Sequence, residues 1–313
     1  MRVKNDAALA IIRLPGSTPL TVSFALKDNK INKFVRLFAT SFLTILLSQV
    51  PSATPSQGSV VLVGAGDIST CDNNNDEATA KLLDVIPGTV FVLGDNVYLD
   101  GTEEEFATCY HPTWGRHKER TMPVPGNHEY FTPGATGYFN YFDNIPSYYA
   151  YDLGAWRIYA LNSEIDVSPS SEQVRWLQND LEANPRLCVL AYWHKPLWSS
   201  RYEDGKDSKF EPLWKLFHDA GAELIVNGHI HNYERFAEMD ASGVAVSPGL
   251  REIVVGTGGV NHDGYVTRLS TSMVRDASTY GVLKLTLSRS SYSWQFIPAA
   301  GGSFRDSGTT HCH

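Results

Sequence analysis

The stretch that decides the fold is TMPVPGNHEY, residues 121–130. Its first half is apolar and ends in proline and glycine, which is typical of a short strand that meets a turn. Its second half places Asn127, His128 and Glu129 directly after that strand. A Gly-Asn pair alone is ordinary turn chemistry, so the meaning of this stretch depends on the residues that end the other strands of the chain.

Further apolar runs, rich in Val, Ile and Leu and often ended by Gly, predict buried strands. They are residues 59–66, 89–94, 156–162, 187–193, 223–228 and 251–259. Helical spacing predicts helices over residues 75–86, 168–183 and 211–220, with Ser168 as the cap of the second and Gly221 ending the third. Residues 280–288 and 291–298 alternate apolar and polar side chains, as in an antiparallel hairpin. The pattern predicts one α/β layered domain over residues 59–300.

Five of the predicted strands end in polar side chains. These are Asp67 in GAGDIS, Asp95 in GDNVY, Asn127 and His128 in GNHE, His194 in WHKP, and His229 and His231 in GHIH. In open α/β sheets ligands bind beyond the carboxyl ends of the strands, so these side chains are expected to converge. Each alone has another explanation, such as a turn or a core histidine. Together, Asp, Asn and His predict a site for Zn, Fe or Mn.

In this order, the motifs GD, GDxxY, GNHE, xxxH and GHxH resemble the calcineurin-like metallophosphoesterase superfamily, over most of residues 59–265. Tyr98 in GDNVY and the extended GHIHNYER make the chain similar to the purple acid phosphatase branch. The resemblance implies an α/β fold, a four-layer β-sandwich of two mixed sheets flanked by helices. It also implies two metal ions, the first held by Asp67, Tyr98 and His231, the second by Asn127, His194 and His229, with Asp95 as the bridge.

The resemblance implies Fe(III) as the first ion, because a phenolate favours a strongly charged cation, and Zn, Fe or Mn as the second. The alternative for Tyr98 is a buried tyrosine whose hydroxyl is satisfied elsewhere.

The expected activity is hydrolysis of small phosphate monoesters by in-line attack of metal-bound hydroxide. His128 is predicted to protonate the leaving alkoxide; its competing role is to position Asp95. His262 is predicted to reach the substrate from the rim, and Ser69 fills a position where purple acid phosphatases have glycine.

Two other functions stay open from the sequence. A phosphodiesterase or nucleotide pyrophosphatase would use the same ions. A non-catalytic binding module with structural metals is less favoured, because structural metal sites tend to be closed and carry no spare acid. The net charge of −8 argues against a nucleic-acid groove. No run of 18 apolar residues exists, so no stable membrane span is expected.

Residues 1–58 differ in composition from the rest of the chain. The basic segment 27–36 precedes the apolar segment 37–48 and a stretch rich in small residues, which is the layout of a secretory signal peptide. Because signals begin at the first residue, we hypothesise that translation starts further downstream; the alternative is a helix packed on the domain. The predicted protein is therefore secreted or periplasmic, and residues 301–313 are predicted to be a C-terminal tail.

Cysteine usage agrees with export. The four cysteines are even in number and lack CxxC spacing, which in an oxidising compartment predicts two disulfides. Cys71 and Cys109 both lie just beyond site loops and are expected to pair. Cys188 and Cys312 would then hold down the end of the chain. Four free thiols are the alternative.

Overall fold

The computed structural model describes residues 9–12, 20–23 and 58–313 of the chain. The chain divides into two compact units, Met1–Ser56 and Gln57–His313. In the first, strand β1 (Leu9–Ile12) pairs antiparallel with β2 (Leu20–Ser23). The predicted signal-like segments, residues 27–36 and 37–48, lie outside the described residues.

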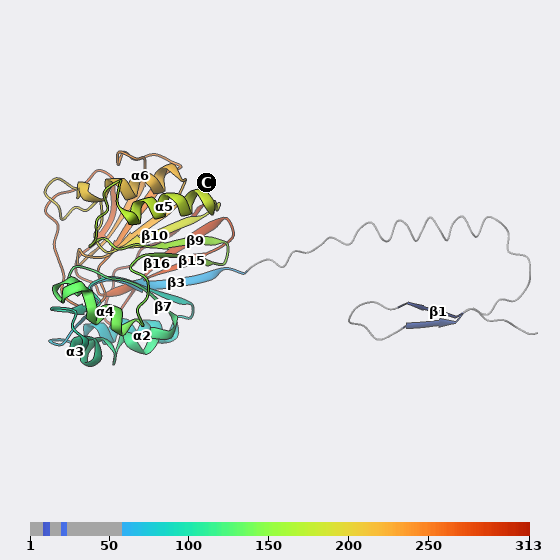
Figure 1. The fold of residues 1–313 in the computed structure, drawn as a ribbon, viewed down its shortest axis with the longest axis horizontal. Coiled ribbons are helices and arrows are strands. Elements are labelled where there is room, and N and C mark those ends of the chain that lie inside the picture. Colours follow the sequence, from blue (N-terminus) through green and yellow to red (C-terminus); the bar gives the residue numbers. More distant parts are fainter. Residues whose placement is uncertain (1–8, 13–19, 24–57) are drawn as a thin grey trace, which may run out of the picture. The chain divides into compact units, whose positions relative to one another are not determined.

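The second unit is built on two large mixed sheets, which lie between outer layers of helices (Figure 1). One sheet has the order β14 (Ser272–Asp276), β12 (Tyr233–Met239), β13 (Leu250–Val255), β11 (Leu224–Asn227), β10 (Val189–Trp193), β9 (Trp156–Ala160), β8 (Tyr149–Leu153). The other has the order β17 (Ser307–His311), β16 (Ser291–Pro298), β15 (Gly281–Leu287), β3 (Val60–Ala65), β5 (Thr89–Leu93), β7 (Thr121–Val124). A short pair joins β4 (Ser69–Thr70) to β6 (Val97–Tyr98). The predicted fold of two mixed sheets flanked by helices is confirmed.

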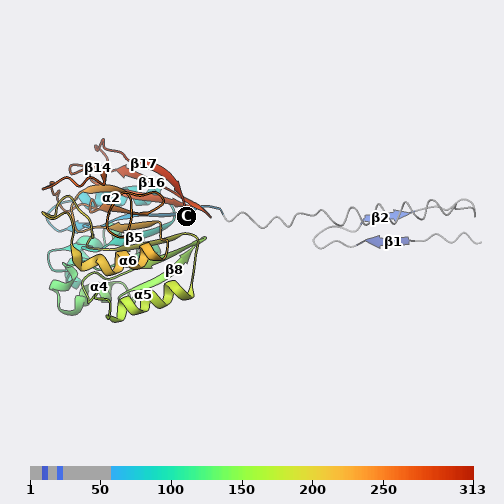
Figure 2. The ribbon, with the colours of Figure 1, turned by 90° about the horizontal axis from the view of Figure 1, so that it is seen from above.

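Helices cover the outer faces of both sheets. Figure 2 shows α5 (Glu172–Ala183) and α6 (Glu211–Asp219) side by side, and Figure 1 places them beyond the seven-stranded sheet. Figure 1 places α2 (Asn75–Val85), α3 (Glu103–Glu105) and α4 (Thr136–Tyr141) on the side of the six-stranded sheet. Tight helical turns span Phe106–Tyr110, Trp114–Arg120, Glu129–Phe131, Pro133–Ala135 and Ser208–Phe210. Within the described ranges, no helix is long and apolar enough to cross a membrane.

The start of α5 differs from the prediction. The helix begins at Glu172, and the side chain of Ser171 accepts a hydrogen bond from the Val174 N–H at 3.2 Å. Ser168, which we expected as the cap, instead forms a turn in which its carbonyl accepts the Ser171 N–H. The sequence offers serines at both positions, and the turn through Pro169 moves the helix start to the second.

The core consists of two apolar layers that share the central strands. In β10, Val189, Ala191 and Trp193 belong to the cluster that includes the apolar faces of α5 and α6. The alternate residues, Leu190 and Tyr192, belong to the cluster that contains side chains of both sheets. Because both faces of this strand are covered, its sequence is a continuous apolar run.

The chain's last residues correct the predicted domain boundary at residue 300. Residues 307–311, expected in a tail, form strand β17, which pairs antiparallel with β16. Their sequence, SGTTH, carries no apolar alternation, because an edge strand with one exposed side buries little. Both predicted disulfides are present, Cys71–Cys109 and Cys188–Cys312, and the second fastens β17 to the start of β10.

Candidate metal centre

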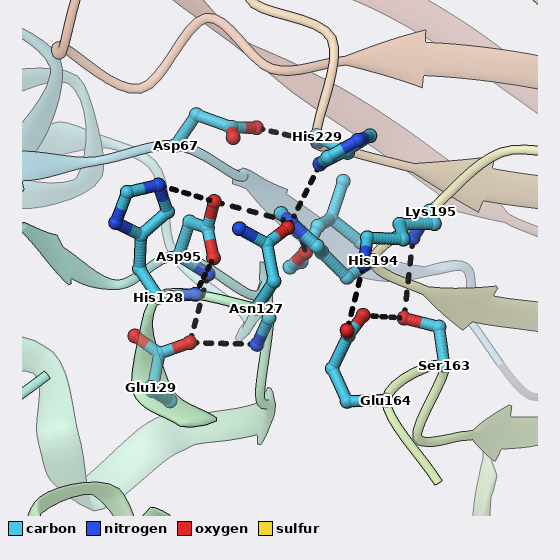
Figure 3. Close-up of polar contacts among 12 residues, drawn as sticks. Asp67, Asp95, Asn127, His128, Glu129, Ser163, Glu164, His194, Lys195 and His229 are labelled. Carbon is cyan, nitrogen blue, oxygen red and sulfur yellow. Dashed lines mark hydrogen bonds and ion pairs between the residues drawn. The ribbon is translucent and has the colours of Figure 1, made fainter. Parts of the chain in front are cut away.

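The predicted ligands lie at the carboxyl ends of parallel strands from both sheets. Strands β3, β5 and β7 run parallel in one sheet, as do β10 and β11 in the other. Asp67 follows β3, Asp95 follows β5, Asn127 follows β7, His194 follows β10, and His229 and His231 follow β11. The Asp67 carboxylate accepts a hydrogen bond from the His229 N–H at 2.8 Å, which joins the two sheets at this edge (Figure 3).

One group of donor atoms gathers around the hydroxyl of Tyr98. Its oxygen lies 2.9 Å from Asp67 Oδ1 and 2.9 Å from Asp95 Oδ2. His231 Nε2 lies 3.2 Å from the same hydroxyl and 3.3 Å from Asp67 Oδ1. These are the residues that the family resemblance assigned to the first ion and the bridge.

A second group gathers around His194 Nε2. This nitrogen lies 3.2 Å from Asn127 Oδ1, 3.2 Å from His229 Nδ1 and 3.2 Å from Asp95 Oδ2. Asp95 Oδ2 therefore contacts both groups. Ligand atoms of Asp95, His194 and His229 all lie within 4.8 Å of one another.

The backbone is strained at three of these positions. Asp67, Asp95 and His229 adopt left-handed conformations with φ of 59°, 47° and 67°. Such conformations are uncommon outside glycine and cluster at functional sites, where surrounding structure holds them. They turn the chain sharply at the strand ends, so that each side chain is directed to the common centre.

Two histidines are oriented through their second ring nitrogen. His194 Nδ1–H donates to the Leu93 carbonyl at 2.7 Å, and His231 Nδ1–H donates to Asn261 Oδ1 at 2.8 Å. Each bond leaves Nε2 directed at the carboxylates, so this is the nitrogen that is available to a metal. Asn261 was missed from the sequence, because it follows a glycine-rich loop with no motif to mark it.

The charges of the site fit cations. Asp67 and Asp95 are 0% and 1% exposed, and the only ion-pair partners of either carboxylate among the described residues are histidines. Buried carboxylates are normally paired with cationic side chains or bound to metals. Burial alone would lower the pKa of His194, but the neighbouring Asp95 outweighs it and raises the pKa to about 10. Hard oxygen donors and imidazoles around two buried negative charges are therefore suited to binding metal.

Tyr98 lies inside this charged group and not in an apolar pocket. Burial, reinforced by the charges of Asp67 and Asp95, raises the pKa of its phenol well above 10. Its hydroxyl is satisfied by the two carboxylates, so its position is compatible with ligation once a cation is bound.

His128 contacts the centre from the solvent side. Its backbone N–H donates to Asp95 Oδ1 at 2.9 Å, and its Nδ1–H donates to the Leu99 carbonyl at 2.5 Å. Its Nε2 lies 3.9 Å from Asp95 Oδ2, and 21% of the side chain is exposed. The backbone N–H of this residue positions Asp95, and the Leu99 carbonyl fixes its ring at the partly exposed side of the centre.

Glu129 is a second residue of the site that sequence reasoning missed. It is fully buried, and its carboxylate accepts hydrogen bonds from the backbone N–H groups of Gly126 at 2.6 Å, Asp95 at 2.9 Å and Asn96 at 2.7 Å. It thereby joins the loops that carry Asp95 and Asn127. Its place in the GNHE motif could have marked it as a site residue, but a sequence does not show that a carboxylate faces backbone amides.

Two other residues make their contacts outside the two groups of donor atoms. Ser69 donates its hydroxyl hydrogen bond to Asp76 at 2.7 Å, so it is a structural residue. The ring of His262 stacks on Tyr280 with centroids 4.0 Å apart, and within the described part of the chain its ring nitrogens have no hydrogen-bond partner. Its neighbour Asn261 contacts His231 instead. A substrate role for His262 stays a prediction.

A family model described as calcineurin-like phosphoesterase matches residues 61–233, which include every predicted ligand. Purple acid phosphatase 15 of Arabidopsis thaliana is 27% identical over 256 residues, 67% of this chain and 46% of that protein. A nucleotide pyrophosphatase/phosphodiesterase of Hordeum vulgare is 25% identical over 268 residues, 71% of each chain.

Among solved structures, purple acid phosphatase PPD1 from yellow lupin (Lupinus luteus) seeds superposes with a TM-score of 0.67 at 20% identity. The match covers 81% of this chain and 54% of that one. This chain therefore spans about half the length of these two plant purple acid phosphatases. The resemblance that the motifs predicted, to the superfamily and to its purple acid phosphatase branch, is confirmed.

Proposed function

The chain belongs to the calcineurin-like phosphoesterase family, and from this membership we propose that it is a binuclear-metal phosphomonoesterase of the purple acid phosphatase kind. The observation that carries the proposal is the position of Asp95 Oδ2, which lies against the Tyr98 hydroxyl at 2.9 Å and against His194 Nε2 at 3.2 Å. One buried carboxylate oxygen that faces two sets of donors is the arrangement expected of a bridge between two ions.

In this proposal Asp67, Tyr98 and His231 hold the first ion, and Asn127, His194 and His229 hold the second. The proposed identities are Fe(III) for the first, following the purple acid phosphatase resemblance, and Zn, Fe or Mn for the second. When bound, such a pair neutralises phosphate oxygens and makes a water nucleophilic near neutral pH.

In this proposal the protein's own residues supply a proton and hold the ligand loops in place. The Leu99 carbonyl accepts from His128 Nδ1–H at 2.5 Å and fixes the ring, so Nε2 is the atom that can donate to a leaving oxygen. Glu129 holds the loops that carry Asp95 and Asn127 at their present separation. Both groups act through geometry that exists before a substrate binds.

A second candidate activity is phosphodiester or pyrophosphate hydrolysis. It is favoured by the similarity to the Hordeum vulgare nucleotide pyrophosphatase/phosphodiesterase, which extends over 71% of both chains. The same ligand set serves both reactions, since either one displaces an alkoxide or phosphate from phosphorus.

The experiment measures hydrolysis of 4-nitrophenyl phosphate and of bis(4-nitrophenyl) phosphate, with metal-loaded protein and with protein treated with chelator. Monoester hydrolysis that chelation abolishes and metal restores supports the phosphomonoesterase. Preference for the diester transfers the proposal to the second candidate. No turnover of either ester by fully loaded protein contradicts both and leaves a non-catalytic metal-binding module.

We also propose export from the cytoplasm. Both disulfides are formed in the structure, and such bonds persist in oxidising compartments. Amino-terminal sequencing of protein recovered from the growth medium tests this. A mature start before residue 27 would contradict a signal peptide in the 27–58 segment.

A further inference from the structure

Two large apolar side chains beside His128 face solvent. Phe131 is 59% exposed and Leu99 is 64% exposed. Single exposed apolar residues are normal on protein surfaces. These two belong to different loops that meet at one imidazole: the Phe131 ring packs against His128, and the Leu99 carbonyl accepts from its Nδ1–H. Apolar residues that gather beside a predicted catalytic group indicate a surface for a ligand.

The contacts place Phe131 at the outer side of the site. Its ring centroid lies 4.8 Å from that of His128, with the rings nearly perpendicular at 68°. The ring of Tyr98, buried among the predicted ligands, lies 4.1 Å from the same imidazole. The imidazole therefore contacts one ring that belongs to the metal centre and another that faces solvent.

The loops that carry the two exposed residues are held firmly. The Thr132 N–H and hydroxyl both donate to the Asp100 carbonyl, at 3.1 Å and 2.7 Å. Gly101 has a φ of 62°, and a Cβ at this position would lie 2.6 Å from the Glu129 Cα. Because the loops pack this closely, Phe131 and Leu99 are presented to solvent by a rigid backbone.

We propose that Phe131 and Leu99 form an apolar subsite for the leaving group, which makes the protein favour phosphate esters of aryl or other apolar alcohols. The proposal rests on the proposed function, since it places the leaving oxygen within reach of His128 Nε2. An aryl group bonded to that oxygen would come within about 4.5–7 Å of the Phe131 ring, the centroid range of aromatic contacts. In this proposal the exposed side chain of Leu99, whose carbonyl holds the same imidazole, extends the apolar surface.

The test compares the binding of phenylphosphonate and methylphosphonate to metal-loaded protein by isothermal titration calorimetry. We expect the wild type to prefer phenylphosphonate by on the order of five-fold, the value of one aromatic contact. Phe131→Ala should abolish most of that preference, and Phe131→Tyr, which keeps the ring, should retain it. Leu99→Ala should reduce it in part.

The matched control is Leu187→Ala. Leu187 is 55% exposed and precedes β10, at the end of the strand opposite to His194. This variant should keep the wild-type preference. Circular dichroism of each variant verifies that it is folded, which the exposure of all three side chains favours.

Hydrolysis of phenyl phosphate and ethyl phosphate by the same variants separates the two proposals. A phenylphosphonate preference that depends on Phe131, in a protein that hydrolyses neither ester, supports the subsite and contradicts the phosphatase. Hydrolysis of both esters with the same ratio of kcat/KM in wild type and Phe131→Ala overturns the subsite alone. Equal binding of the two phosphonates by the wild type, or binding of neither, also overturns it.

Discussion

Asp95 shows how much of the proposed chemistry rests on a single side chain. It is 1% exposed, its Oδ1 accepts the His128 N–H, and its Oδ2 faces the Tyr98 hydroxyl and His194. Nearby histidines outweigh its burial and hold its pKa well below the usual range, so the carboxylate is ionised. A buried anion with these neighbours requires compensation by positive charge.

Replacing Asp95 should therefore affect both ions together. We expect Asp95→Asn to weaken metal binding by more than about 100-fold, the upper range for residues that only orient ligands, and to abolish hydrolysis. Inductively coupled plasma mass spectrometry should find well below two metal ions per chain. Asp143→Asn, whose side chain is 79% exposed, should bind metal like the wild type. Normal metal content in Asp95→Asn means that Asp95 is no bridge.

Tyr98 tests the identity of the first ion. If iron is bound there, the wild type absorbs visible light through tyrosinate-to-iron charge transfer, and Tyr98→Phe should lose that band while keeping much of the second metal. The control is Tyr110→Phe, because Tyr110 is also buried but its hydroxyl has no partner among the residues that the structure describes. Absorption spectra and metal analysis of both variants give the answer. A colourless, active wild type that contains only zinc or manganese contradicts the iron assignment.

Among the elements, α5 illustrates how local contacts set a boundary. Leu177 and Val174 pack inward one turn apart, and the helix is capped by Ser171. The cap satisfies the Val174 N–H, one of the donors that the first turn of a helix leaves without a partner. The helix covers the outer face of the seven-stranded sheet, and the Ser171 side chain bonds the first turn of its own helix, so we expect the cap to contribute to stability and not to chemistry.

Removing that cap should lower stability alone. We expect Ser171→Ala to reduce the free energy of unfolding by about 1 kcal/mol, which lowers the melting temperature by about 2–4 °C in a domain of this size. Ser168→Ala should have a smaller effect, because among the described residues its hydroxyl bonds only the exposed Asp166. Calorimetry of the two variants compares them directly. A larger loss in Ser168→Ala would restore Ser168 as the cap.

At the scale of the molecule, the two disulfides fasten parts of the chain that are far apart in sequence. Cys71–Cys109 joins residues 38 positions apart, and Cys188–Cys312 joins residues 124 positions apart. The second bond ties the last strand of the six-stranded sheet to a central strand of the other sheet. A cross-link stabilises mainly by restricting the unfolded chain, and the restriction grows with the length of the loop.

The disulfide that closes the longer loop, Cys188–Cys312, should therefore contribute more to the free energy of unfolding. We expect replacement of either cysteine pair by alanine to lower the free energy of unfolding by about 2–5 kcal/mol, with the loss at Cys188–Cys312 larger by about 1 kcal/mol from loop length. Urea unfolding of the two double variants measures the difference. Equal losses, or a larger loss at Cys71–Cys109, would show that local packing outweighs loop entropy.

The sequence by itself determined the layers, the ligand candidates and the cysteine pairs. Strands that are buried on both faces must be apolar throughout, and the polar residues that end them, Asp67, Asp95 and His194 among them, are conspicuous after such runs. The periodic spacing of apolar residues that predicted the helices and the β15–β16 hairpin also depends only on nearby residues. These features depend on residues that are neighbours along the chain, so they were predictable.

The tertiary structure alone decided the contacts that hold the site together. Asn261 orients His231 across 30 positions, Glu129 accepts from the Asp95 loop across 34, and the Asp67 carboxylate accepts from His229 across 162. It also decided that Phe131 faces solvent beside His128, and that SGTTH completes a sheet. No short window of sequence contains both partners of these three hydrogen bonds, because folding is what brings them together.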